Sequence, residues 1–358
     1  MTRVAWNWTW SNEKASHLRT VAPLAKEKFD MNYRRLGKTD FDVSEISLGT
    51  WQVGGKWGDP FDDKVAERIL NEAIDRGVNF IDTADVYSDG LSESAVGRVV
   101  RERSEYIYVA TKCGRQINPH TAENYTVKAL RGYVEESLRR MKIERIDLIQ
   151  LHSIPNDVYY RPEIFGLFER LREEGKIQHL GVSVEKVEEA IKAMEYPNVT
   201  AVQIIFNVFR QRPSELFFDL VKKHDVGVIA RVPLASGMLT GKFSKDTTFG
   251  EEDHRNFNRN GEAFDKGETF SGIDYDEGLE AVEELKAIFP GEKNLAPNAL
   301  QWILSFPEVS CVIPGASKLE HLQSNLSVTD MEPLTPSELD AMNKIYQQRV
   351  KPSVHQRW

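Results

Sequence analysis

The sequence predicts a (β/α)8 barrel, the TIM-barrel arrangement of parallel strands enclosed by helices. From residue 31 onward, short β-branched runs alternate with amphipathic stretches of helical period, which indicates repeated strand–helix units and a parallel sheet. Eight strand segments can be counted, the number that closes such a barrel. A doubly wound sheet is the alternative, but the first strand runs into GTWQVGG (residues 49–55), without the expected GxGxxG spacing.

The predicted elements follow one another along the chain. Strands are predicted at 45–48, 78–81, 106–111, 146–151, 179–183, 201–206, 226–230 and 309–313. Helices are predicted at 63–76, 93–102, 125–141, 163–174, 187–194, 214–223, 277–288, 297–305, 319–325 and 336–346. In the third helix, for example, Leu130, Val134, Leu138 and Met141 share one face, as a helix packed on a sheet requires.

Two segments depart from the strand–helix alternation. Residues 32–36 and 41–43, around Gly37 and Lys38, predict a β-hairpin before the barrel. A polar, glycine-containing insertion at 241–276, after the seventh strand, predicts a lid over the barrel mouth, with a plain surface excursion as the alternative. The expected divisions are an N-terminal extension (1–30), the barrel (31–350) and a C-terminal tail near the pocket (351–358).

Composition narrows the class of protein. The formal net charge of −9 disfavours a nucleic-acid partner, because an acidic surface repels phosphate backbones. No apolar run reaches the roughly 18 residues of a membrane span, and the N-terminus has no signal-peptide core. Cys113 and Cys311 predict two unpaired thiols in a reducing cytoplasm. The sequence leaves an oligomer possible.

Polar residues stand where successive predicted strands end. Asp82 and Tyr87 follow the second strand, Lys112 the third and His152 the fourth. Each alone fits an ordinary structural role, such as a strand-end cap or a buried histidine. Together they indicate one site, because the carboxyl ends of barrel strands meet at a shared mouth.

These four side chains suit the protonation of a carbonyl oxygen. A free tyrosine has a pKa near about 10, and a neighbouring ammonium such as Lys112 is expected to lower it. Asp82 would hold Lys112, and His152 would orient the carbonyl. The hydride for a carbonyl reduction must come from a cofactor. Asp82, Asp85 and His152 lack the spacing of a metal site, so no metal is predicted.

Several motifs resemble those of the aldo/keto reductase superfamily over roughly residues 32–350. They are FIDTADVY (80–87), VATK (109–112), IQLHS (149–153), GVS (181–183), VQ (202–203), PLASGMLTGKF (233–243) and VIPGA (312–316). The chain is also similar to a bacterial subgroup with HRNFNR (254–259), GETFSG (267–272) and a terminal His-x-Arg-Trp. The resemblance implies a (β/α)8 barrel, an extended NAD(P)H at its mouth and reversible carbonyl–alcohol conversion. It makes Tyr87 the general acid/base, tuned by Lys112 and Asp82, with His152 positioning the carbonyl.

The resemblance also implies a cofactor site. Ser183 and Gln203 would hold the carboxamide, and Val184 stands where relatives often have asparagine. Arg231 replaces a ring-stacking tyrosine, and would either stack itself or bind an anionic substrate. Lys318 would bind a 2′-phosphate at a helix N-terminus, so NADPH is favoured and NADH stays possible. The predicted cofactor-binding residues are Gly49, Thr50, Trp51, Ser183, Gln203, Arg231, Pro233, Leu234, Ser236, Gly237, Leu239, Lys242, Gly315, Ser317, Lys318, His321 and Asn325.

The expected partner is a small-molecule carbonyl or alcohol. Its predicted pocket residues are Trp51, Trp57, His254, Arg255 and Trp358, whose aromatic walls suit a sugar ring or an aromatic carbonyl. Three functions stay open at this point. They are an aldehyde or ketone reductase, a dehydrogenase of a sugar-type alcohol, and a nucleotide-binding regulatory barrel without turnover.

Overall fold

The predicted barrel is confirmed in the computed structural model, which describes residues 31–55 and 58–358. Eight parallel strands pair in the order β10-β9-β8-β7-β6-β5-β4-β3. Their bounds are β3 (Leu48–Gly49), β4 (Phe80–Asp82), β5 (Tyr108–Cys113), β6 (Ile146–His152), β7 (Ile177–Ser183), β8 (Val199–Ile205), β9 (Gly227–Arg231) and β10 (Val309–Val312). An N-terminal extension is predicted for residues 1–30, and a place in the pocket is predicted for Trp57. Both lie outside the described residues.

The two edge segments of the sheet meet and close the barrel. The Ser47 amide donates to the Val312 carbonyl and the Val312 amide to the Glu45 carbonyl, each at 2.9 Å. Gly49 lies beside this seam, and a Cβ there would stand 2.7 Å from the Ile313 carbonyl oxygen. Only glycine allows the two segments to approach this closely at the mouth.

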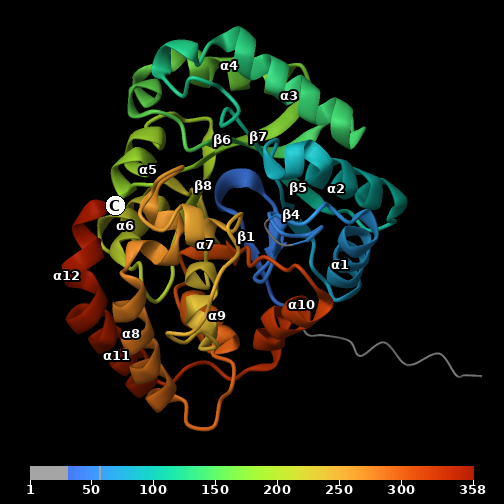
Figure 1. Cartoon of the computed structure of the whole chain (residues 1–358). Helices are drawn as coiled ribbons and strands as arrows, with labels where there is room; N and C mark the ends of the chain where they lie inside the picture. The colour runs from blue at the N-terminus through green and yellow to red at the C-terminus, as the bar shows by residue number, and fades with distance from the viewer. Residues whose placement is uncertain (1–30, 56–57) are drawn as a thin grey trace, which may run out of the picture.

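Helices surround the strands, as Figure 1 shows. The outer elements are α1 (Asp63–Asp75), α2 (Leu91–Glu102), α3 (Val127–Met141), α4 (Pro162–Glu173), α5 (Val187–Ala193), α6 (Leu216–His224), α8 (Tyr275–Ile288), α9 (Ala296–Leu304), α10 (Leu319–Leu326) and α11 (Pro336–Ile345). The predicted helix starts agree with local capping: Asp62 accepts hydrogen bonds from the first turn of α1, and Thr335 with Glu338 forms a capping box on α11. None of the helices in the described ranges is long and apolar enough to cross a membrane.

The predicted hairpin is present as β1 (Tyr33–Arg35) and β2 (Asp42–Ser44), paired antiparallel. Its apolar residues close the amino-terminal end of the barrel, where Leu36, Phe41 and Val43 belong to the buried cluster inside the strands. The strand members of that cluster are Phe80, Ala110, Leu148, Ala201, Ile229 and Cys311. This apolar layer therefore forms the floor beneath whatever the strands carry at their carboxyl ends.

Two segments differ from the predicted pattern. The insertion at 241–276 is not a bare loop, since it contains α7 (His254–Phe257) and short 3-10 turns at Lys266–Glu268 and Phe270–Gly272. The C-terminal tail is helical, continuing from α11 through a π-helical turn at Tyr346–Val350 into α12 (Lys351–Val354). Tyr346, Val350, Val354 and Trp358 recur every four residues and are buried, which is the spacing that keeps the chain helical against the barrel.

Candidate active site

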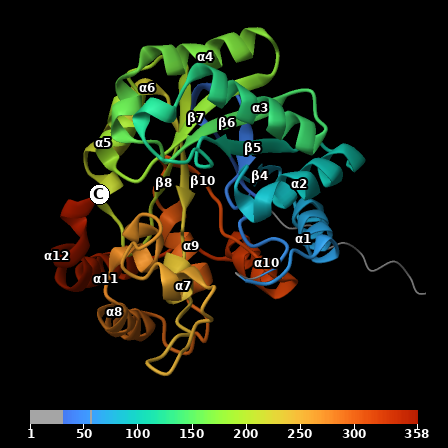
Figure 2. The same ribbon diagram turned by 45° about the horizontal axis from the view of Figure 1, so that its top comes forward.

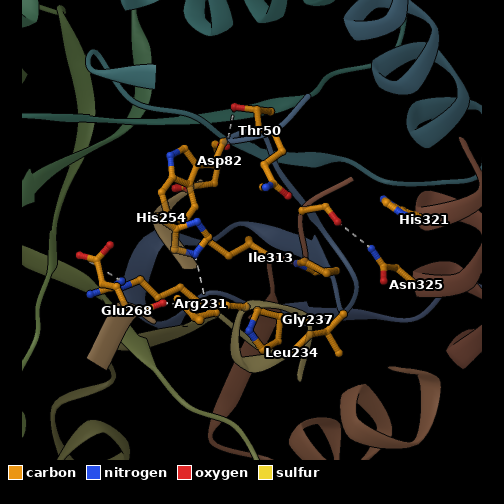
Figure 3. A pocket seen from close by; sticks show the side chains of 18 of the residues that line it. Thr50, Asp82, Arg231, Leu234, Gly237, His254, Glu268, Ile313, His321 and Asn325 are labelled. Carbon is orange, nitrogen blue, oxygen red and sulfur yellow. Dashed lines mark hydrogen bonds and ion pairs between the residues drawn. The ribbon is translucent and has the colours of Figure 1, made fainter. Parts of the chain in front are cut away.

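The candidate site is a cavity of about 590 Å³ at the carboxyl ends of the strands. Figure 3 shows it as an elongated space, with Asp82, His254 and Glu268 toward one end and His321 and Asn325 toward the other. Figure 2 shows α7 and its flanking loops on this side of the barrel. The insertion contributes residues to the cavity wall, in agreement with the predicted lid.

Strand periodicity places the polar core of the site. Asp82, Lys112, Gln150 and Gln203 each stand two residues after a member of the apolar floor, so they point into the barrel one layer higher. Gly181, the strand neighbour of Gln150, has no side chain to compete for this space. The switch from apolar to polar inward residues along the same strands therefore creates the site.

Lys112 is the centre of this layer and is completely buried. Its Nζ donates to Asp82 Oδ1 at 2.5 Å, to the Thr83 carbonyl at 2.8 Å and to Tyr87 Oη at 3.1 Å. An ammonium has three protons and no acceptor, so these three bonds satisfy it fully. Because the Tyr87 oxygen accepts from Lys112, the phenolic proton stays available for a group in the cavity.

Two amides hold the other carboxylate oxygen of Asp82. Gln150 Nε2 donates to Asp82 Oδ2 at 2.9 Å, and Gln203 Nε2 donates to the same oxygen at 2.8 Å. Gln203 is predicted to bind the cofactor, and no role is predicted for Gln150. The inward register of Gln150, two residues after Leu148, is the signal that would have found it.

The electrostatics of Tyr87 and Lys112 favour a protonated pair. Burial raises the pKa of Tyr87, and the opposing effect of the Lys112 ammonium is smaller. Lys112 lowers the tyrosine pKa as predicted, but desolvation outweighs this effect and the net shift is upward. Burial would lower the pKa of Lys112, but Asp82 and Tyr87 outweigh it and raise that pKa. At neutral pH the pair therefore stands as an ammonium and a phenol.

His152 is neutral in this setting. Burial lowers its pKa well below the ordinary value, and the positive charges of Arg115, Lys112 and Arg231 lower it further. Its ring centroid lies 6.2 Å from that of Tyr87 in an edge-on arrangement. Its Nδ1 is buried without a hydrogen-bond partner among the described residues. An orphaned acceptor is tolerated better than an orphaned N–H, which favours the tautomer with the proton on Nε2.

A second group of charges lies beside the cavity and comes from strand ends, loops and the lid. Arg231 Nη2 donates to Glu185 Oε1 at 2.7 Å and to the Val184 carbonyl at 3.1 Å. Glu268, on the lid, accepts from Arg115 Nη1 at 3.0 Å and lies 3.8 Å from Arg231. Burial would raise the pKa of Glu185, but Arg231 and the nearby arginines outweigh it and lower that pKa to about 2.

The far end of the cavity offers backbone donors, and two lysines, Lys242 and Lys318, are among the residues that line the cavity. Ser236 and Gly237 are consecutive residues with positive φ on the cavity wall, and the Gly237 amide donates to the Leu234 carbonyl at 2.9 Å. Helix α10 begins after Lys318 without a side-chain cap, so its first amides are open to a ligand. Asn325 Nδ2 donates to the Gly315 carbonyl at 3.1 Å. This end suits phosphate groups.

The structure brings most predicted residues to the cavity. Of the catalytic set, Asp82, Tyr87 and His152 line it and Lys112 lies directly behind them. The predicted cofactor residues that line it are Gly49, Thr50, Trp51, Ser183, Gln203, Arg231, Pro233, Leu234, Ser236, Gly237, Lys242, Gly315, Lys318, His321 and Asn325. The predicted substrate residues His254 and Arg255 line it as well.

Three predicted residues are not on the cavity wall. Leu239 is buried in the apolar core, and Ser317 pairs with His321 Nδ1 at 3.2 Å. Trp358 lies under the lid instead, where its indole donates to Asp265 Oδ1 at 2.8 Å and its ring stacks on Arg210. Those contacts depend on the helical path of the tail, which was not anticipated.

Other lining residues were missed altogether. Among them are Arg115, Phe264 and Glu268, which stand in the loop after β5 and in the lid. Glu268 lies in the GETFSG segment and Phe264 in the predicted lid, but the sequence alone does not place these loop residues on the cavity wall, because they reach it through tertiary packing. Within the described residues, no group of three or more histidine, cysteine or carboxylate side chains is arranged to hold a metal ion.

Comparison with known proteins agrees with this geometry. The sequence profile of the aldo/keto reductase family matches residues 45–347. An uncharacterized oxidoreductase, YqkF of Bacillus subtilis, is 30% identical over 318 residues, which span 87% of this chain and 95% of that protein. The holo form of aldo-keto reductase AKR11C1 from Bacillus halodurans superposes with a TM-score of 0.73 at 27% identity, covering 91% of this chain and 99% of the other. Glycerol dehydrogenase AKR11B4 from Gluconobacter oxydans gives a TM-score of 0.73 at 30% identity, with 89% and 96% covered. The chain is therefore an oxidoreductase-type barrel that belongs to the aldo/keto reductase family.

Proposed function

We propose that this protein is an NADPH-dependent reductase of aldehydes or ketones in which Tyr87 donates the proton to the carbonyl oxygen. The contact between the Lys112 ammonium and the Tyr87 hydroxyl, with Lys112 anchored on buried Asp82, carries the proposal. The ammonium stabilises negative charge on the phenolic oxygen as its proton leaves, which lowers the barrier to transfer. The same arrangement supports the reverse reaction with Tyr87 as base.

The cavity fits an extended nicotinamide nucleotide, which supplies the hydride when bound. Gln203 and Ser183 would hold the carboxamide, since among the described residues the Gln203 amide oxygen has no protein donor. The positive-φ turn at Ser236 and Gly237 and the open amides of α10 would hold phosphates. Lys318 at the rim would bind a 2′-phosphate and favour NADPH over NADH.

His152 would position the carbonyl. As a neutral ring with its proton on Nε2, it donates one hydrogen bond to the oxygen that Tyr87 protonates. Two donors converging on one oxygen form the electrophilic site for hydride transfer. We also place the enzyme in a reducing compartment, the cytoplasm, because Cys113 and Cys311 are buried free thiols.

The first test combines nucleotide binding with turnover. Titration of the purified protein with NADPH and NADH, followed by tryptophan fluorescence, measures the two Kd values. Tyr87→Phe is expected to keep the Kd for NADPH within a few fold and to abolish reduction of a simple aldehyde. Tyr160→Phe, an exposed tyrosine outside the cavity, is the matched control and keeps full turnover. Turnover by Tyr87→Phe at the wild-type rate contradicts the acid role, and absence of nucleotide binding contradicts the reductase itself.

A further inference from the structure

The polar layer above the apolar floor contains one residue that the reaction proposed above does not use. Gln150, on β6, is completely buried and is not among the residues that line the cavity. A ligand in the cavity would therefore meet the neighbours of Gln150 and not Gln150 itself. Those neighbours are the reacting groups, since Lys112 on β5 is the register partner of Gln150.

The amide of Gln150 has defined partners on both of its polar atoms. Its Nε2 donates to Asp82 Oδ2 at 2.9 Å, and its Oε1 accepts from Gln203 Nε2 at 3.1 Å. The reversed amide would place two acceptors, Oε1 and Asp82 Oδ2, against each other, so the donor orientation is fixed. The neighbouring strand leaves room for this side chain, because a Cβ at Gly181 on β7 would stand only 3.2 Å from Gln150 Cγ.

Gln203 makes a similar contact with Asp82 but has a second task. Its Nε2 donates to Asp82 Oδ2 at 2.8 Å, and its side chain lines the cavity. Under the function proposed above, Gln203 also holds the carboxamide of the nucleotide, which competes with its bonds inside the polar layer. Gln150 lies outside the cavity and has no such competitor. It is therefore the donor that can stay on Asp82 Oδ2 throughout turnover.

The charge of Asp82 opposes the formation of a Tyr87 phenolate. Burial raises the pKa of Tyr87 most, and the Asp82 carboxylate adds to that rise, whereas the Lys112 ammonium lowers the pKa. Lys112 Nζ contacts both Asp82 Oδ1 and Tyr87 Oη. An N–H dipole directed at the other oxygen, Oδ2, draws the carboxylate charge away from Lys112. More of the ammonium charge then remains to stabilise the phenolate that forms during proton transfer.

We propose, on the basis of the reductase function above, that Gln150 is a positioning residue for proton transfer. It fixes the Asp82 carboxylate against Lys112 and disperses its charge, which stabilises the Tyr87 phenolate as the proton leaves. Because Gln150 touches neither nucleotide nor carbonyl, its loss slows the chemical step and leaves binding unchanged. The amide acts as a hydrogen-bond donor, so a side chain of the same shape that cannot donate does not replace it.

Two variants separate the donor from the shape of the side chain. The measurement is the maximal single-turnover rate of NADPH oxidation with the faster of two aldehydes, propanal and D-glyceraldehyde. Gln150→Leu removes the donor, and we expect the rate to fall about 10- to 100-fold. The aldehyde concentration for half-maximal rate and the Kd for NADPH, measured by fluorescence, should stay within about threefold of wild type. Gln150→Glu keeps the shape, but its new carboxyl group donates only when protonated.

The pH dependence of Gln150→Glu is the sharpest readout. Lys112 and Gln203 stabilise the charge on Asp82, so the new carboxyl group takes the proton, and the adjacent carboxylate raises its pKa above the ordinary value of about 4.3. The rate relative to wild type should therefore be highest at about pH 5.5 and fall to the Gln150→Leu level by about pH 8.5. The other titratable groups nearby, Tyr87 and His152, are common to both proteins and cancel in this ratio.

Gln178 supplies a matched control. Its Nε2 donates to Asp147 Oδ1 at 2.7 Å, so it is another glutamine–aspartate contact between β6 and β7, at their amino-terminal ends and away from the cavity. Gln178→Leu and Gln178→Glu should keep the wild-type rate at each pH. A loss in these variants equal to that of the Gln150 variants would show that any such contact in the barrel has the same effect, which overturns the specific role of Gln150.

The remaining outcomes also distinguish the positioning role from the reductase function. A rate for Gln150→Leu within twofold of wild type, or a Gln150→Glu ratio that does not change with pH, overturns the positioning role alone. A tenfold rise in the Kd for NADPH makes Gln150 a binding residue instead. If Gln150→Leu does not fold, as judged by thermal melting, the pH profile of Gln150→Glu decides. Nucleotide binding by wild type without turnover of either aldehyde contradicts the reductase function, and the positioning role with it.

Discussion

The two sides of the cavity are built in different ways. On one side, Asp82, Lys112, Gln150 and Gln203 come from barrel strands, and their hydrogen bonds link four neighbouring positions in one buried layer. On the other side, Arg115, Glu185, Arg231 and Glu268 come from strand ends, loops and the lid. Strand pairing holds the first group in place whatever the loops do. The second group exists only when distant segments pack together, so it is the side where specificity can vary while the chemistry is kept.

The largest effect is expected on the strand-borne side, from Lys112→Met. The change removes the charge that stabilises the Tyr87 phenolate and leaves the Asp82 carboxylate buried without its counter-ion. We expect kcat to fall by at least about 1,000-fold and the free energy of unfolding by about 3–5 kcal/mol. Steady-state kinetics and chemical denaturation measure both. Lys128→Met, on the exposed face of α3, is the control, and a kcat within tenfold of wild type would refute the role of Lys112.

The loop-borne side is expected to respond to Trp358→Ala. Trp358 is buried, stacks on Arg210 at 4.1 Å and fits against Gly272, where a Cβ would stand 2.2 Å from its ring. Removing it creates a cavity under the lid and costs about 3 kcal/mol of stability. KM for the carbonyl should rise more than kcat falls, because the strand-borne group is untouched. Trp358→Phe keeps the ring stacked on Arg210 but loses the hydrogen bond to Asp265. Its stability and its KM should therefore lie between those of wild type and Trp358→Ala. A fall in kcat with unchanged KM would show that the two sides are not separable.

The carboxyl group of Asp85 is expected to make the stability of the protein depend on pH. Burial and Glu93 raise the pKa of this completely buried carboxyl to about 7, and neither of its oxygens has a hydrogen-bond partner among the described residues. A carboxyl group whose pKa is raised by folding does not change the free energy of unfolding at a pH below its unfolded pKa of about 4, because it is protonated in both states. It destabilises the protein progressively as the pH rises to about 7, after which the penalty is constant.

Asp85→Asn should therefore stabilise the protein more at pH 8 than at pH 5. Thermal melts of wild type and variant at the two pH values measure the difference in Tm. Asp219→Asn, on the exposed face of α6, supplies the control, with equal small changes at both pH values. A wild-type Tm that rises more than that of Asp85→Asn between pH 5 and pH 8 would contradict the direction of the shift.

The smallest effect concerns the nucleotide end, far from both groups. Lys318→Ala should weaken NADPH binding about tenfold while leaving NADH binding within twofold, because only NADPH carries the 2′-phosphate. Fluorescence titration with both nucleotides gives the ratio. Lys344→Ala, an exposed lysine of α11, serves as the control. Equal losses for the two nucleotides would place the 2′-phosphate elsewhere.

The same division explains what could be predicted from the sequence. Asp82, Lys112 and His152 were found because parallel strands end at one mouth, which needs only the order of the elements. Arg115 and Glu268 lie 153 residues apart in irregular segments, and no local pattern foretells their contact. Trp358 was expected on the cavity wall. Buried residues recur at every fourth position before it, so the tail stays helical and Trp358 lies under the lid. The sign of the Tyr87 pKa shift depends on desolvation, which only the packed structure reveals.

Single-turnover kinetics test the central claim most directly. Protein saturated with NADPH is mixed with excess D-glyceraldehyde and, separately, propanal, and the loss of nucleotide absorbance is followed in wild type and Tyr87→Phe. This isolates hydride transfer from product release. We predict that Tyr87→Phe slows the step by at least about 1,000-fold with both carbonyls, while its Kd for NADPH stays within a few fold of wild type. Hydride transfer at the wild-type rate in Tyr87→Phe would contradict the proposed mechanism.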